Sequence, residues 1–270
     1  TSEVRMVKCF TFVFRHPTFF VFSYVITLAV LMADSIEKNK WYIIANCLLL
    51  FMAQRSKGYL IILVAVIVVI VGTERIRTLC KNFTGDSKIK YRYLVVGIVI
   101  FSLLVAVVSK SKIEENVKYG LTAARPALYI TGFKIALDMF PLGSGFGTFA
   151  STLSGEYYSN IYKMYGISNV YGLTPEKYNY MADVFWPYIY GQFGFFGLVA
   201  YIALLFKIFK SQIIRLEDYN KIIAYITLWI YMIFASSAET FFTNETALQA
   251  VLLLNIFIGV DKEKKLKETS

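Results

Sequence analysis

The chain has 270 residues, of which 57% are hydrophobic and 17% are charged, and its formal net charge is +10. A soluble domain is usually about 45–50% apolar and about 25% charged, so the composition indicates an integral membrane protein. The basic residues lie between apolar segments rather than in one soluble region, which argues against nucleic-acid binding. They serve better as signals of membrane topology and as partners for anionic lipid or phosphate.

The first ten residues begin with Thr1 and lack the charged, apolar and cleavage regions of a signal peptide. We therefore expect the chain to be the C-terminal part of a longer polytopic protein. Its three cysteines show no paired spacing, and a single histidine, His16, leaves no histidine-based zinc site. We expect neither a metal nor a cofactor.

Seven apolar runs predict an all-α polytopic protein with about seven transmembrane helices. Several runs are shorter than the roughly 20 residues that a perpendicular helix needs. We therefore expect the second and third runs to extend into residues 54–58 or to end in a protein-lined cavity. The runs are Thr18–Ala33, Trp41–Ala53, Tyr59–Gly72, Tyr93–Val108, Val184–Phe209, Ile222–Ala235 and Thr246–Val260.

The orientation follows from lysine and arginine, which gather in residues 73–92, 207–221 and 261–270. These segments are predicted to be cytoplasmic, which also places the C-terminus in the cytoplasm. Residues 1–270 then form one membrane domain, with residues 109–183 as a large, helical extracytoplasmic loop. Residues 1–17, 54–58 and 236–245 also lie outside, although Arg5, Lys8 and Arg15 in the first of these disagree mildly with the rule.

Among the basic residues on the predicted outer face, which break the positive-inside preference, the candidates for a bound ligand are Arg15, Arg55, Lys57 and Arg125. Such cations need a partner, and near a membrane surface a lipid-linked phosphate is the obvious one. The alternative is that they extend to lipid headgroups without binding a specific ligand.

The loop at residues 109–183 is far longer than a connection between two helices requires. Its tyrosines, glycines and isolated charges beside a membrane predict a functional site. Within it, Arg125-Pro126 predicts a helix start, because proline is favoured at the first helical position. The helix would run to about Phe140, and the free N–H groups around Arg125 would favour a diphosphate. The alternative is an interfacial arginine without a ligand.

The segment from Gly143 to Thr148 is glycine-rich, but no strand precedes it, so a nucleotide loop is not indicated. It either forms a turn or contacts a ligand directly. Asp183, at the start of a span, is either a general base toward a sugar hydroxyl or the cap of the following helix. Glu239 is a weaker second carboxylate.

Seven tyrosines in residues 157–180 could stack on sugar rings, with Tyr157 and Tyr158 as the candidates, or form an interfacial aromatic belt.

Taken together, these motifs resemble the O-antigen ligase and O-antigen or capsule polymerase superfamily, over nearly the whole chain. The matching elements are Phe14-Arg15-His16-Pro17, Ser56-Lys57-Gly58, Arg125 followed by Pro141–Phe149, and Asp183 followed by Gly191–Gly197. The resemblance implies a membrane glycosyltransferase of the GT-C type. It would be inverting and metal-independent, and would use an undecaprenyl-diphosphate-linked glycan as donor.

The same resemblance implies that Arg125 and, by position, Lys57 hold the diphosphate, while Asp183 takes the proton of the acceptor hydroxyl. Many ligases have histidine where this chain has Asp183 and arginine where it has Lys57, which favours a polymerase that joins lipid-linked repeat units. The implied location is the bacterial cytoplasmic membrane, with flippase and chain-length regulator proteins as partners. The alternatives are a ligase that uses another acceptor, a lipid-linked oligosaccharide flippase or other transporter, and a non-catalytic scaffold.

Overall fold

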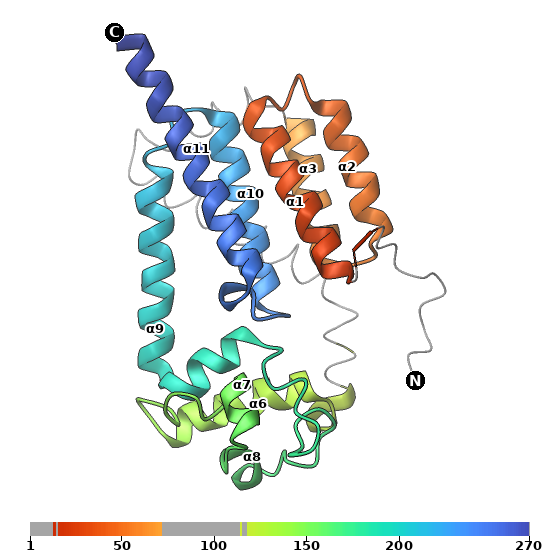
Figure 1. Cartoon of the computed structure of the whole chain (residues 1–270), viewed down its shortest axis with the longest axis vertical. Coiled ribbons are helices and arrows are strands. Elements are labelled where there is room, and N and C mark those ends of the chain that lie inside the picture. Colours follow the sequence, from red (N-terminus) through yellow and green to blue (C-terminus); the bar gives the residue numbers. More distant parts are fainter. Residues whose placement is uncertain (1–12, 15, 72–113, 115–117, 270) are drawn as a thin grey trace. The chain divides into compact units, whose positions relative to one another are not determined.

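The computed structural model describes residues 13–14, 16–71, 114 and 118–269 (Figure 1). Over these residues every regular element is an α- or 3-10 helix, and none is a strand. This confirms the all-α prediction for the described part of the chain. The chain divides into two compact units: residues 1–109, 213–231 and 248–270 form the first, and residues 110–212 and 232–247 form the second.

The first unit contains α1 (Pro17–Asp34), α2 (Lys40–Met52), α3 (Ser56–Val71), residues 219–231 of α10 (Tyr219–Ser236) and most of α11 (Glu245–Thr269). The helix α1 begins within one residue of the predicted start. The His16 side chain caps this end by accepting a hydrogen bond from the N–H of Thr18 at 3.2 Å. The helix α3 begins inside the polar hinge, as expected for a third run that extends into residues 54–58.

The second unit contains η1 (Gly120–Thr122), α6 (Ala124–Asp138), α7 (Thr152–Glu156), α8 (Ile161–Met164), α9 (Phe185–Ile213) and η2 (Phe241–Thr243). Its short helices enclose an apolar core of their own, so the described part of the predicted loop is a folded region rather than a linker. The core residues are Ala127, Leu128, Ile135, Phe149, Ala150, Tyr162, Ile167, Leu173, Met181 and Val184.

The helix α9 differs from the single uninterrupted span that its sequence predicts. Gly194 has φ 63° and ψ −163°, so two helical segments meet there at a break. A residue in this conformation interrupts the i to i−4 hydrogen-bond ladder of a helix. Only glycine adopts it at little cost, because a Cβ atom there would clash with the Pro141 carbonyl.

Two of the described helices, α1 and α9, are long and apolar enough to cross a membrane. They indicate membrane association by length and composition alone. Three other helical stretches, Lys40–Met52, Ser56–Val69 and Glu245–Gly259, are apolar but shorter. The predicted span Tyr93–Val108 lies outside the described residues, and the count of seven spans stays a prediction.

Replacing Gly194 with alanine should destabilise the protein strongly, because the new Cβ meets both a left-handed backbone and the Pro141 carbonyl. We expect a loss of about 2–4 kcal/mol, measured as a lower unfolding temperature of the purified protein in detergent. Two matched variants separate the causes. Gly166 has φ +71° but no atom within 4 Å of an added Cβ, so Gly166→Ala should cost less. Gly259 lies at an open position inside α11, so Gly259→Ala should leave the unfolding temperature unchanged or raise it slightly, because alanine favours the helix. Equal unfolding temperatures for all three variants would contradict the packing assigned to Gly194.

Candidate functional site

Arg125 lies in the first turn of α6, as the sequence predicts, and the helix ends at Asp138. The helix starts two residues earlier than expected, at Ala124, so Pro126 occupies the third helical position rather than the first. The first-turn N–H groups have no partner within a helix, so proline loses nothing at any of these positions. Ala123 provides no side-chain cap, so no capping side chain occupies the positive end of the helix.

The structure brings Arg125 and Asp183 together, although 58 residues separate them in the chain. A guanidinium nitrogen of Arg125 donates to the Asp183 carboxylate at 3.1 Å, and the two side chains are 47% and 36% exposed. Asp183 lies two residues before the first residue of α9, so its described side-chain contact is this ion pair rather than a helix cap. The pair therefore sits at an open surface that an anionic ligand can reach.

Two aromatic side chains anchor the backbone on either side of this ion pair. Tyr129, one turn after Arg125, donates its hydroxyl to the Ser237 carbonyl at 2.7 Å, and Trp186 donates its indole N–H to the Ser236 hydroxyl at 3.0 Å. Burial raises the pKa of Tyr129 to about 12, against the opposing effect of the Arg125 charge, so this hydroxyl remains a donor at physiological pH. Both halves of the pair are thus fixed to adjacent residues at the end of α10.

The helices α6 and the first segment of α9 also touch between these anchors. A Cβ atom at Gly132 would lie 2.8 Å from the Tyr190 ring, so only glycine allows the approach. The Tyr190 hydroxyl donates to the Tyr129 carbonyl at 3.0 Å. Sequence reasoning did not identify Tyr129, Trp186 or Tyr190 as site residues, because their partners are 50 to 108 residues away.

The backbone N–H groups of the glycine-rich segment bond to α9 in the described structure. The N–H groups of Ser144 and Gly145 donate to the Gly191 and Gln192 carbonyls, each at 2.9 Å. The Gly147 N–H donates to the side-chain oxygen of Gln192 at 2.7 Å. Because these N–H groups already bond to the broken helix α9, the turn interpretation is favoured over a loop that cradles a ligand.

The predicted sugar contacts differ in their accessibility. Tyr157 is 84% exposed and remains open to a ligand. Tyr158 is half-buried, its hydroxyl donates to the Leu173 carbonyl at 2.9 Å, and its ring lies 5.6 Å from that of the fully buried Tyr162. Tyr158 and Tyr162 therefore hold the small core together, whereas Tyr171 is exposed like Tyr157.

The remaining predicted site residues are distributed over other parts of the chain. Arg55 and Lys57 belong to the first unit, where the Lys57 ammonium lies 5.9 Å from the centre of the Tyr231 ring. Arg15 lies outside the described residues. Glu239 is half-buried just after α10, in the second unit, where its N–H donates to the Ala235 carbonyl. The parts assigned to these residues stay predictions.

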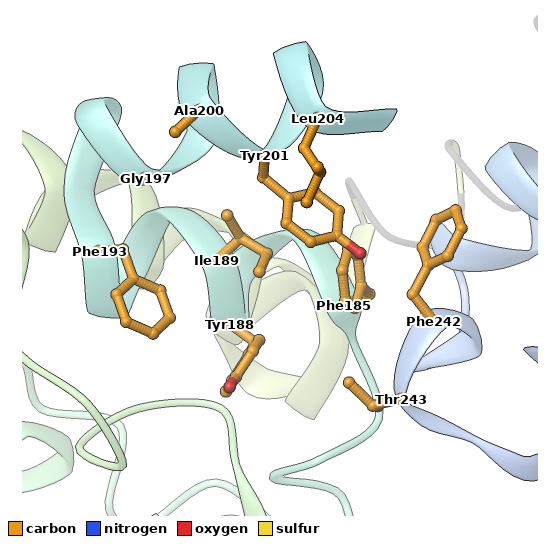
Figure 2. A pocket seen from close by; sticks show the side chains of 10 residues that line it. All are labelled: Phe185, Tyr188, Ile189, Phe193, Gly197, Ala200, Tyr201, Leu204, Phe242 and Thr243. Carbon is orange, nitrogen blue, oxygen red and sulfur yellow. The ribbon is translucent and has the colours of Figure 1, made fainter. Parts of the chain in front are cut away.

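A cavity of about 510 Å³ lies in the bend of α9 (Figure 2). It is an open pocket, and residues on both sides of the break at Gly194 line it, together with η2. Aromatic and aliphatic side chains dominate its wall, which suits an apolar chain better than an ion. The lining residues are Phe185, Tyr188, Ile189, Phe193, Gly197, Ala200, Tyr201, Leu204, Phe242 and Thr243.

Within the described residues, no group of three or more histidine, cysteine, aspartate or glutamate side chains could hold a metal ion. Comparison of the chain with protein-family models, curated proteins and solved structures gives no match. The superfamily resemblance therefore remains an expectation that rests on the motifs alone.

The anchoring of the ion pair predicts a difference between two conservative tyrosine changes. Tyr129→Phe removes the hydrogen bond to the Ser237 carbonyl and should lower stability by about 0.5–1.5 kcal/mol. Tyr157→Phe, at an exposed position, should leave stability unchanged. Thermal unfolding in detergent measures both effects, and an unchanged unfolding temperature for Tyr129→Phe would contradict the anchor.

Proposed function

We propose that this chain polymerises lipid-diphosphate-linked oligosaccharide repeat units into O-antigen, capsular polysaccharide or exopolysaccharide. The reaction takes place at the outer face of the bacterial cytoplasmic membrane, on a seven-span protein with a cytoplasmic C-terminus. Donor and acceptor are both undecaprenyl-diphosphate-linked glycans, and flippase and chain-length regulator proteins are the expected partners. The observation that carries the proposal is the exposed contact between Arg125 and Asp183 at the start of α6.

The arginine supplies what a diphosphate leaving group requires. Its guanidinium has several N–H groups in a planar fork, which matches two phosphate oxygens at once. The first-turn N–H groups of α6 and the positive end of the helix dipole add to the attraction. Negative charge on the diphosphate grows as the glycosidic bond breaks, so this arrangement stabilises the transition state more than the bound substrate.

The aspartate supplies the proton acceptor. In a single displacement, the acceptor hydroxyl oxygen forms a bond to the anomeric carbon while the bond from that carbon to the diphosphate oxygen breaks. The electron pair leaves with the diphosphate, the hydroxyl proton passes to Asp183, and the anomeric configuration inverts. Lys57, Arg55 and Arg15 remain further predicted phosphate contacts, and Tyr157 and Glu239 remain predicted contacts of the sugar.

The cavity in the bend of α9 offers a place for the apolar chain of a lipid-linked substrate. Phe185, which lines it, follows Asp183 by two residues, so an apolar wall and the ion pair lie close along the chain. Charged and apolar binding surfaces in one unit fit an amphiphilic substrate better than a free sugar. This pairing favours an enzyme of lipid-linked glycans over a non-catalytic scaffold.

We expect Arg125→Ala to abolish polymer formation in a strain without the native gene, at an unchanged protein level. Loss of one charge-stabilising group typically lowers turnover about 100-fold or more. Arg215→Ala is the matched control, because Arg215 is an exposed arginine just after α9 in the first unit. Gel analysis of the polysaccharide is the measurement, and normal long chains from Arg125→Ala would exclude the diphosphate contact.

The lipid-linked glycans of a knockout strain distinguish the proposed function from its alternatives. Single repeat units accumulating on the outer leaflet indicate a polymerase. Full-length polymer that remains on the lipid indicates a ligase, and repeat units trapped on the inner leaflet indicate a flippase. Either of the last two outcomes would overturn the polymerase assignment.

A further inference from the structure

In the proposed reaction Arg125 binds a phosphate and Asp183 accepts a proton, so the contact between the two residues has to open. In the described structure each is the other's partner, at 3.1 Å. We infer that a substrate phosphate and the Asp183 carboxylate exchange places at Arg125, so that binding of the phosphate releases the carboxylate. This inference rests on the proposed function for the identity of the ligand.

The geometry of the ion pair suits an exchange. One nitrogen contacts one oxygen, and about half of the Arg125 side chain is exposed, so a second anion can approach before the first leaves. An exposed ion pair of this kind is weak, since water and salt screen it. A diphosphate carries more charge than a carboxylate and can accept from two N–H groups of the fork, so it is the stronger partner.

The surroundings restrict the change to side chains. Tyr129 and Trp186 anchor the two backbones to Ser237 and Ser236, and the Asp183 N–H donates to the Tyr180 carbonyl at 3.3 Å. A bound phosphate repels the nearby carboxylate, which can then rotate about its own side-chain bonds without moving either helix. The carboxylate is thereby freed only when the leaving group is in place.

This order of events has a chemical use. While the phosphate site is empty, the positive charge of Arg125 neutralises Asp183 and the pair presents no net charge. After the phosphate binds, Arg125 faces the leaving group and Asp183 is available to the acceptor hydroxyl. The two catalytic charges therefore separate only in the presence of substrate, which couples substrate binding to release of the base.

The test is the binding of geranylgeranyl diphosphate to the purified full chain in detergent, measured by calorimetry. If Asp183 competes with the ligand, Asp183→Asn should lower the Kd about two- to fivefold, while the same variant should lose polymer formation. Asp138→Asn is the matched control, because Asp138 lies at the far end of α6 and accepts from Tyr165 rather than from an arginine. It should leave the Kd unchanged.

Two further comparisons show whether the effect passes through Arg125. In an Arg125→Gln background, Asp183→Asn should no longer tighten binding, which gives a coupling in a double-mutant cycle. Geranylgeraniol, which has no phosphate, should bind the wild type and Asp183→Asn equally. An unchanged or weaker affinity of Asp183→Asn for the diphosphate, or equal tightening in both backgrounds, would overturn the exchange.

These outcomes are separate from the fate of the proposed function. If the exchange is right and the polymerase assignment is wrong, the binding pattern appears but knockout strains retain full polymer. If the polymerase assignment is right and the exchange is wrong, polymer depends on Arg125 while Asp183→Asn leaves the Kd unchanged.

Discussion

The second unit depends on the hydrogen bonds that join the glycine-rich segment after α6 to the break in α9. At Gly194 the helix loses its regular ladder, and the surrounding backbone groups take partners from another part of the chain. Gly191 and Gln192 accept from Ser144 and Gly145, while the Phe196 N–H donates to the Pro141 carbonyl at 3.4 Å. A break in a helix destabilises a protein when the freed backbone N–H and C=O groups have no hydrogen-bond partner. Here the segment after α6 supplies such partners. Gln192, fully buried, completes the connection through the Gly147 N–H and the Phe149 carbonyl.

The site geometry follows from this connection. The C-terminal end of α6 is held at the break in α9, and α6 runs in the same direction as the first segment of α9. Close contact at Gly132 keeps them together along their length, and their other ends place Arg125 beside Asp183. The same break bends α9, and the apolar cavity lies in the bend (Figure 2). The break at Gly194 thus lies between the segment that packs on α6 and the segment that completes the apolar wall.

Local signals in the sequence predicted most of the helices and each half of the ion pair. The apolar runs located α1, α2, α3, α10 and the start of α11, and Arg125-Pro126 located the start of α6 to within a residue or two. The pairing of Arg125 with Asp183 was beyond such reasoning, because it depends on a tertiary contact across 58 residues. The break in α9 was equally hidden, since Gly191, Gly194 and Gly197 lie in an apolar run that reads as one span. Local propensity cannot distinguish a glycine that packs in a helix from one that breaks it.

The hydrogen bonds that hold this unit together differ from the contact between Arg125 and Asp183 in how exposed they are to solvent. The backbone bonds at the break and the Trp186 anchor involve buried or half-buried groups, and each would leave an unpaired polar atom if it opened. The Tyr129 anchor ends on the exposed residue Ser237. The contact between Arg125 and Asp183 is exposed, so water can take the place of either partner at small cost. The most exposed of these interactions is therefore the one between Arg125 and Asp183, the two groups proposed to react. A ligand that changes only this contact can act on both groups while the frame that positions them stays intact.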